Sequence, residues 1–378
     1  MKSVTVLIGR NGTGKSNLME AIIIIFRNLD LEESPKFVYK LRYICRGHTI
    51  EISANPTNID HTKIVIDNEK ISISKFYKNK ISYLPNHVFA YHSGSSSILE
   101  PHFNDHLNKS LKDFKNELDV PLRRLFYARD LLSQFVLLSF FSFQDENAQK
   151  FLKDYFDISN LDSVLFILKE PKNWMNDGAI NGDKRFWNAT SLASEFLGEI
   201  YSNSLAPIRD KGEIALKFDK RTEVEFLYLF IPNDKSFRKA TEKYGNQKLL
   251  NTLEMIYSAG LIHKIYIKVE TRNIKKLLTF EDLSDGEQQL LTVLGLLKFT
   301  KENESLFLLD EPDTHLNPAW NPSSSDPQLN YSFFMFKQPP NGIDAIDFLF
   351  SENIHMKKFC KTDFLTKLHL YMLLLPYN

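Results

Sequence analysis

The first 26 residues combine two hydrophobic patterns. Residues 4–8 form a short β-branched apolar run, which is typical of a buried parallel strand. Residues 16–26 carry apolar side chains in a pattern that predicts a helix. The glycine-rich stretch GRNGTGKS connects them at 9–16. The expected order is therefore strand, loop, helix.

Short runs of β-branched and aromatic residues follow this helix. We expect an antiparallel meander from them, because turn-forming segments separate the runs. A further strand is predicted at 87–94, where the apolar run ends in a cluster of glycine and serine. We place the end of a first domain there, at residue 96. The predicted meander strands are 37–45, 49–54, 62–67 and 70–75.

Longer stretches with helical spacing occupy residues 97–215, which we interpret as an inserted helical region. Its aromatic and leucine stripes are expected to be core, because any packed helix needs an apolar face. Strand patterns then return at 222–231, 263–270 and 275–280, together with a predicted helix at 247–258. The expected divisions are 1–96 and 216–320 for the two halves of one domain, 97–215 for the insertion, and 321–378 for a tail.

Composition limits the function classes. The 378 residues are 43% apolar, which is ample for real cores. Lys plus Arg and Asp plus Glu number 47 each, so no global basic field indicates nucleic acid, although a local patch stays open. Cys45 and Cys360 match no metal spacing and fit a reducing compartment. With no signal peptide and no apolar run long enough to span a bilayer, we expect a soluble cytoplasmic protein without a membrane partner.

The glycine-rich loop has two interpretations. A strand-to-helix turn often needs glycine for positive φ, but Gly9, Gly14, Lys15 and Ser16 also satisfy G-x-x-x-x-G-K-[ST]. We favour a phosphate cradle, in which backbone N–H groups and the helix dipole bind polyphosphate. Lys15 would contact the β- and γ-phosphates and the Ser16 hydroxyl would coordinate Mg²⁺. The expected nucleotide-binding residues are Gly9, Arg10, Asn11, Gly12, Thr13, Gly14, Lys15, Ser16 and Asn17.

Two later stretches extend this chemistry. Ser284, Asp285 and Gly286 precede an amphipathic helix, and taken alone they read as an N-cap or a capping box. Further on, the apolar run 306–309 leads into Asp310 and Glu311. A buried strand that ends in two acids is costly without a cationic partner, and Mg²⁺ with ATP is such a partner.

Together, GRNGTGKSN, LSDGEQQ and LFLLDEPDTHLNP resemble the Walker A, signature and Walker B–D-loop motifs of ABC-type ATPase heads. They resemble bacterial AAA-family ATPases of restriction and anti-phage systems, which are related to the overcoming-lysogenization-defect and recombination-repair ATPases. The resemblance implies an α/β P-loop NTPase fold with a mainly parallel sheet, an antiparallel β lobe and a helical insertion.

The same resemblance implies roles for individual residues. Asp310 would hold the water shell of Mg²⁺ as part of the metal site, Glu311 would polarise the attacking water, and Lys15 would assist catalysis. Ser284 and Gly286 would contact the γ-phosphate of an ATP held by a second protomer. The expected assembly is a homodimer or higher even oligomer with ATP between the heads, and Asp313 would lie at that interface.

Three functions stay open at this point. Residues 17–283 separate the first two motifs, which disfavours a transporter, and no long coiled coil or nuclease domain is apparent. The leading interpretation is the ATPase of a phage-defence or restriction system that gates a separately encoded effector nuclease. The alternatives are a DNA-repair ATPase that clamps DNA directly, and an inactive nucleotide-binding module that regulates a partner.

Two features depart from the family pattern. The strand at 87–91 continues into AYHSGSS without the expected Q-loop glutamine, so His92 or Ser93 would at best substitute. The tail at 321–378 is rich in turn signals and lacks the expected helix and following strand with a switch histidine, and His355 and His369 lie in unsuitable contexts. We therefore expect the tail not to be the native continuation, through a frameshift or truncation, which would leave a parallel-sheet edge uncovered.

Overall fold

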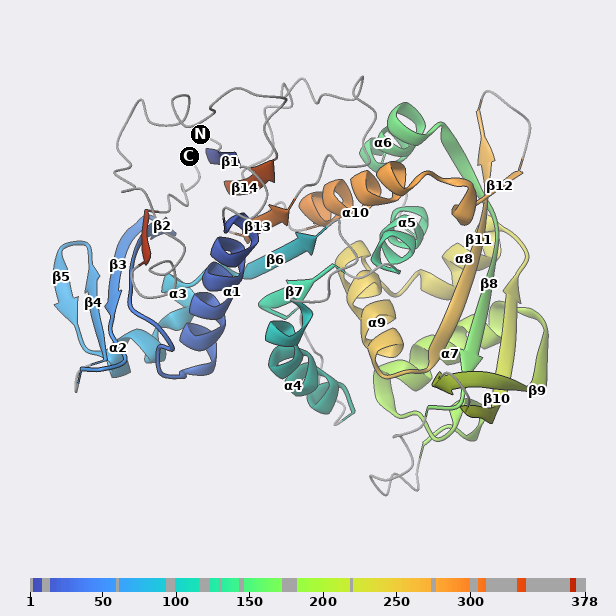
Figure 1. Ribbon diagram of the computed structural model, residues 1–378. Helices are drawn as coiled ribbons and strands as arrows, with labels where there is room; N and C mark the ends of the chain where they lie inside the picture. Colours follow the sequence, from blue (N-terminus) through green and yellow to red (C-terminus); the bar gives the residue numbers. More distant parts are fainter. Residues whose placement is uncertain are drawn as a thin grey trace. The chain divides into compact units, whose positions relative to one another are not determined.

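The computed structural model divides into two compact units (Figure 1). Unit 1 contains residues 1–104, 124–129 and 300–378, and unit 2 contains residues 105–123 and 130–299. The structure describes residues 3–8, 14–58, 61–92, 99–115, 123–128, 131–142, 146–171, 182–217, 220–272, 277–299, 305–310, 332–337 and 368–371.

A parallel sheet of five strands carries the N-terminal motif in unit 1. Its order is β1-β14-β13-β6-β7, and every neighbouring pair is parallel. The predicted strand at 4–8 is confirmed, and the one predicted at 87–94 is confirmed as far as His92, since residues 93 and 94 lie outside the described residues. The strand that ends in Asp310 is buried along its whole length. Because the strands are parallel, their carboxyl ends meet at one edge of the sheet. The strands are β1 (Ser3–Ile8), β14 (Ser332–Lys337), β13 (Ser305–Asp310), β6 (His87–His92) and β7 (Leu125–Tyr127).

Strand β14 corrects the interpretation of the tail. It lies between β1 and β13, with Phe334 opposite Thr5 on one side and opposite Leu308 on the other. The expectation that no strand follows Walker B is therefore wrong. The short apolar run SFFMFK was overlooked because turn signals surround it, whereas two parallel neighbours supply its hydrogen bonds. That the tail is not the native continuation stays a prediction.

A second sheet in unit 1 contains the predicted meander. It pairs four antiparallel strands in chain order, and β15 (Leu368–Tyr371) joins its free edge in parallel with β2. The expected strand at 70–75 is only partly correct, because Ser72 caps helix α2 by accepting from the Lys75 N–H at 3.3 Å. The elements are β2 (Tyr39–Cys45), β3 (His48–Ala54), β4 (Thr62–Ile66), β5 (Glu69–Ile71), α2 (Ile73–Lys78) and α3 (Lys80–Tyr83).

One hydrophobic core joins both sheets of unit 1 through helix α1 (Lys15–Leu31). Phe26 on this helix meets Tyr43 on β2 edge to face, with ring centroids 5.6 Å apart. Burial raises the pKa of Tyr43 well above its ordinary value, so its hydroxyl stays protonated and donates to the Tyr83 carbonyl at 2.9 Å. The meander therefore fixes the long helix whose first turn lies at the predicted phosphate loop.

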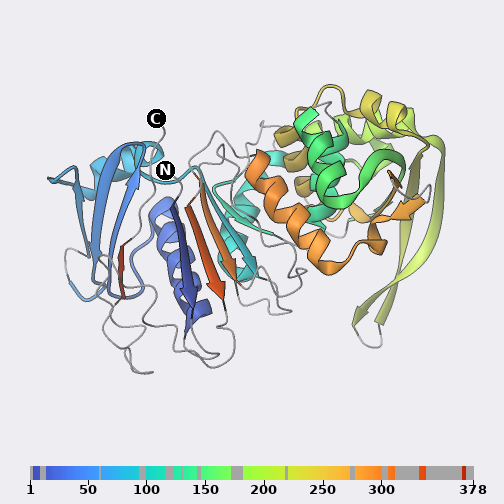
Figure 2. The same ribbon diagram turned by 90° about the horizontal axis from the view of Figure 1, so that it is seen from above.

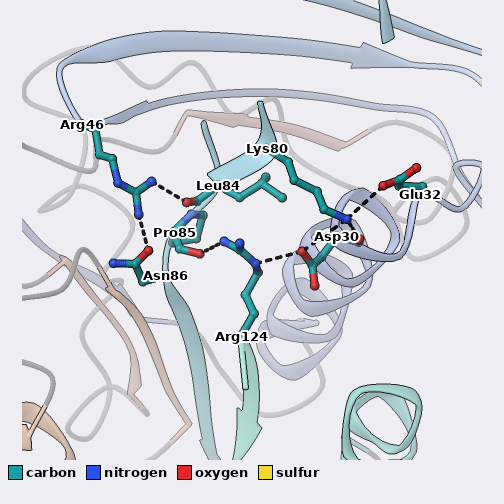
Figure 3. Close-up of polar contacts among 8 residues, drawn as sticks. All are labelled: Asp30, Glu32, Arg46, Lys80, Leu84, Pro85, Asn86 and Arg124. Atoms are coloured by element: carbon teal, nitrogen blue, oxygen red, sulfur yellow. Dashed lines mark hydrogen bonds and ion pairs between the residues drawn. The ribbon is translucent and has the colours of Figure 1, made fainter. Parts of the chain in front are cut away.

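A polar network fixes the other end of α1 (Figure 3). Arg124, at the start of β7, pairs with Asp30 at 2.9 Å and donates to the Pro85 carbonyl. Lys80 donates to the Asp30 carbonyl at 2.6 Å, and Arg46 donates to the Leu84 carbonyl at 2.8 Å. These contacts tie the last turn of the helix to the segment that enters β6. Both ends of α1 are thus positioned relative to the parallel sheet.

Unit 2 is built around a separate antiparallel sheet of order β12-β11-β8-β10-β9. The predicted strands at 222–231 and 263–270 and the helix at 247–258 are confirmed, and the strand at 275–280 is shortened to Leu277–Thr279. The compact units differ from the predicted boundaries, because unit 2 continues to residue 299 and so takes in most of the segment 216–320. The predicted helical insertion at 97–215 also holds β8 and most of β9. The strands are β8 (Ile158–Lys169), β9 (Leu205–Lys217), β10 (Lys220–Ile231), β11 (Ile262–Thr271) and β12 (Leu277–Thr279).

Helix α5 (Leu132–Ser142) lies at the centre of the helices of unit 2, between α9 and α10 (Figures 1 and 2). It is buried on every side, as expected for a helix that is apolar all round. Within the described residues, no helix combines the length and apolar character that crossing a membrane requires. The remaining helices are α4 (Asn104–Lys115), α6 (Glu146–Phe156), α7 (Ser191–Asn203), α8 (Asp234–Thr241), α9 (Asn246–Ser258) and α10 (Asp285–Phe299), with short 3-10 turns at Glu100–Phe103, Lys184–Phe186 and Phe280–Asp282.

Candidate nucleotide-binding site

Gly14 begins helix α1 in a conformation that favours glycine. Its φ of 91° and ψ of 18° lie in the left-handed region, and its carbonyl accepts the first helical hydrogen bond from Leu18 at 3.0 Å. The first turn contains no acidic residue, and no side chain caps it. The N–H groups and positive dipole end of this 17-residue helix therefore favour an anion.

Three side chains that are distant in sequence meet at the carboxyl edge of the parallel sheet. The Ser16 hydroxyl donates to Asp310 Oδ2 at 2.9 Å, although the two residues are 294 positions apart. The His92 ring contacts the same oxygen through Nδ1 at 2.9 Å. Asp310 is buried, with only 2% of its surface exposed, whereas Ser16 is exposed. The buried carboxylate is thus hydrogen-bonded to a serine that is itself exposed to solvent.

The donor set fits Mg²⁺. This ion prefers oxygen ligands in octahedral geometry and usually binds one or two carboxylates together with water and phosphate. Ser16 and Asp310 would supply one hydroxyl and one carboxylate oxygen to such an ion, and their hydrogen bond holds the two oxygens 2.9 Å apart. Among the described residues, no group of three or more His, Cys, Asp or Glu forms a metal cage. One hydroxyl and one carboxylate leave the other positions around Mg²⁺ to water and phosphate, so this donor set suits a metal shared with a nucleotide.

The other predicted P-loop residues are placed as follows. Lys15 is half-buried and Asn17 is exposed in the first turn of α1, next to Ser16. The predicted roles of these residues stay predictions. Several predicted residues lie outside the described part of the chain, namely Gly9, Arg10, Asn11, Gly12, Thr13, Ser93, Glu311, Asp313 and His355. His369 lies on β15, in the meander sheet.

The signature residues belong to unit 2, where they begin helix α10. Ser284 and Glu287 form a reciprocal capping box, because the Ser284 hydroxyl accepts from the Glu287 N–H at 3.3 Å and Glu287 Oε2 accepts from the Ser284 N–H at 2.8 Å. The capping interpretation of this stretch is thereby confirmed. Ser284 is exposed and Gly286 is buried. The Ser284 hydroxyl also donates to Glu287 Oε2 at 2.8 Å, so a phosphate would compete with this carboxylate.

The contact between His92 and Asp310 was not anticipated from the sequence, which pointed to His92 only as a replacement for glutamine. The two residues are opposite one another in the register of β6 and β13. A signal was nevertheless available, because both residues end apolar strand patterns and parallel strands end at the same edge.

The fold and this arrangement define a class. The chain has the parts of a P-loop nucleotide-binding protein. They are a strand, a loop with the P-loop spacing, a helix capped by Gly14, and a buried acid at the end of another strand of the same parallel sheet. Residues 4–323 match the family model described as "AAA domain, putative AbiEii toxin, Type IV TA system". The chain belongs to this AAA-domain family, which makes ATP the expected nucleotide.

A search of curated proteins found no match. Among solved structures, the recombination mediator protein RecF with ATP, from the RecFOR pathway, is similar at 12% sequence identity. The similarity covers 91% of this chain and 89% of that chain, with a TM-score of 0.27.

Proposed function

We propose that this protein is a Mg²⁺-dependent ATPase with an ABC-type head. The observation that carries the proposal is the contact of Ser16 with Asp310 at the N-terminus of α1. It joins the last residue of the predicted P-loop to the acid that ends strand β13, and these are the two groups that a Mg²⁺-bound triphosphate requires. The match to an AAA family supports the same assignment.

Different residues of this chain would bind the phosphates, hold the ion and activate the attacking water. The N–H groups at the start of α1 bind the phosphates, and Lys15 places a compact cation against the β- and γ-phosphates. Ser16 and Asp310 hold the ion, which neutralises developing charge on the phosphate oxygens when it is bound. Glu311 follows directly in sequence and orients the attacking water as a general base.

We propose that hydrolysis requires a second copy of the chain. Ser284 and Gly286 would contact the γ-phosphate of an ATP held by the partner, which gives a homodimer or a higher even oligomer. The capping box adds a condition to this step. Since Glu287 accepts from both the N–H and the hydroxyl of Ser284, it must release at least one of them when phosphate arrives.

The biological proposal is that ATP-driven engagement and release of two heads gates a separate effector nuclease in phage defence or restriction. The description of the matched family names a putative toxin of a type IV TA system, which favours a multi-component system over a solitary enzyme. A DNA-repair ATPase that clamps DNA is the alternative, and a steep fall of DNA-stimulated turnover with salt would identify it.

Two variants test the proposed chemistry. Lys15→Ala should abolish ATP binding in equilibrium dialysis, whereas Lys36→Ala, which removes an exposed lysine of the same unit, should not. Glu311→Gln should bind ATP with little hydrolysis and accumulate as a dimer in sedimentation velocity. Normal turnover by Glu311→Gln would remove Glu311 from the mechanism. Unchanged ATP binding by Lys15→Ala would refute the P-loop assignment.

A further inference from the structure

His92 ends β6 directly beside Asp310 at the end of β13. Its Nδ1 lies 2.9 Å from Asp310 Oδ2, which is the oxygen that also accepts from Ser16. The His92 side chain is 19% exposed and that of Asp310 is 3% exposed, so water has little access to their contact. A carboxylate can only accept here, so the hydrogen on this contact belongs to the ring.

We propose that His92 is a positioning residue for the metal site. It donates from Nδ1 to Asp310 and holds the carboxylate in the rotamer that directs Oδ2 toward Ser16. A buried carboxylate with fixed donors loses less rotational freedom when a cation binds, and such supporting contacts orient the ligands of many metal sites. The inference rests on the proposed Mg²⁺·ATP site at Ser16 and Asp310.

The surroundings explain why this contact matters. Ser16 approaches Asp310 from the first turn of α1, while His92 approaches from the adjacent strand. The two donors therefore hold one oxygen from two separate elements. Among the described residues, Ser16 and His92 donate to Asp310 Oδ2. Removing the His92 ring would leave this oxygen with the Ser16 hydroxyl as its donor.

The matched variants differ in where they place a donor. Asparagine puts its amide nitrogen near the position of Nδ1, glutamine puts its nitrogen near that of Nε2, and leucine supplies no donor. The probe is Mn²⁺, whose free signal in electron paramagnetic resonance disappears on binding. Mn²⁺ is titrated into the full-length protein with a non-hydrolysable ATP analogue. Analogue binding in EDTA is measured separately, and His61→Leu controls for the loss of an exposed histidine.

We expect His92→Leu and His92→Gln to weaken nucleotide-dependent Mn²⁺ binding by roughly 10-fold to 100-fold. His92→Asn should stay close to the wild-type value, and His61→Leu should equal it. Analogue binding in EDTA should be the same in all of these proteins.

Equal Mn²⁺ affinity in wild type and His92→Gln, or equal weakness in His92→Asn and His92→Gln, would overturn the role of His92. The comparison of asparagine with glutamine decides the question even if the leucine variant does not fold. A wild-type protein that binds no Mn²⁺ with the analogue would instead overturn the proposed function.

Discussion

Replacing Gly295 by alanine should loosen the helix that carries the signature residues. Gly295 lies on α10 against α5, and a Cβ at this position would lie 2.1 Å from Val136 Cγ1 and 3.2 Å from Val136 Cβ. Val136 is fully buried. Figure 1 and Figure 2 both show the two helices side by side within unit 2.

Two opposing effects decide the outcome. Alanine is favoured over glycine in a helix interior by about 1 kcal/mol. Carbon atoms attract one another best at about 3.5–4.0 Å, so a methyl group at 2.1 Å must push the helices apart or force Val136 from its rotamer. Valine has one strongly preferred rotamer in a helix, and overpacking a core costs about 1–3 kcal/mol. The clash outweighs the propensity gain, which leaves unit 2 less stable by up to about 2 kcal/mol.

Hydrogen exchange of amides in α5 and α10 measures this effect locally. Gly295→Ala should exchange faster than wild type, and Val136→Ala in the same chain should recover part of the loss because it vacates the space. Gly198→Ala on α7 is the control, since its Cβ would meet only Arg185 Nη2 at 3.6 Å and should be neutral or stabilising. Exchange in Gly295→Ala as slow as in wild type, or no coupling to Val136→Ala, would refute the close packing.

Three further outcomes follow from unit 1. Asp310→Asn removes a buried charge, so the nucleotide-free protein should be as stable as wild type or more stable. The rise in melting temperature that Mg²⁺ and ATP cause in the wild type should disappear, and an undiminished rise would contradict the metal assignment. Arg124→Ala should lower the free energy of unfolding in urea by about 1–3 kcal/mol, because Asp30 loses its closer ion pair and keeps the one with Lys80 at 4.0 Å, while the Pro85 carbonyl loses a donor. Arg42→Ala, which breaks an exposed pair, should change it by less than about 1 kcal/mol. Phe334→Pro should abolish ATP binding, because proline cannot donate within a strand that has neighbours on both sides; retained binding would show that the site does not need β14.

The sequence predicts best those elements whose structure is determined by the hydrophobic pattern or residue spacing within the element itself. Alternation along 39–54 indicates a half-buried meander, and the spacing from Gly9 to Ser16 indicates a phosphate loop. The meeting of Ser16 and Asp310 was also foreseeable, because both follow apolar strands that end at one edge of a parallel sheet.

The parts predicted worst are placed by distant partners. Strand β9 contains several charged residues, and its sequence does not predict a strand. It nevertheless pairs with β10 over most of its length. Ion pairs across that hairpin, such as Lys211 with Glu223 at 3.1 Å, join charges that sequence patterning treats as a solvated run. Strand β8 lies within the region 97–215, which the sequence pattern predicts to be helical, because helix and strand patterns are hard to separate in apolar runs.

Strand β14 links the question of the tail to the geometry of the site. Neighbouring strands lie about 4.8 Å apart, so β1 and β13 are separated by about 10 Å with β14 between them. The contact of Ser16 with Asp310 at 2.9 Å is therefore formed across the width of a strand that the tail supplies. If β1 paired directly with β13, Asp310 would move about 5 Å relative to the start of α1, and this contact would be lost. If the tail is not the native continuation, as the sequence predicts, the native one must supply its own parallel strand at this position to keep the contact of Ser16 with Asp310.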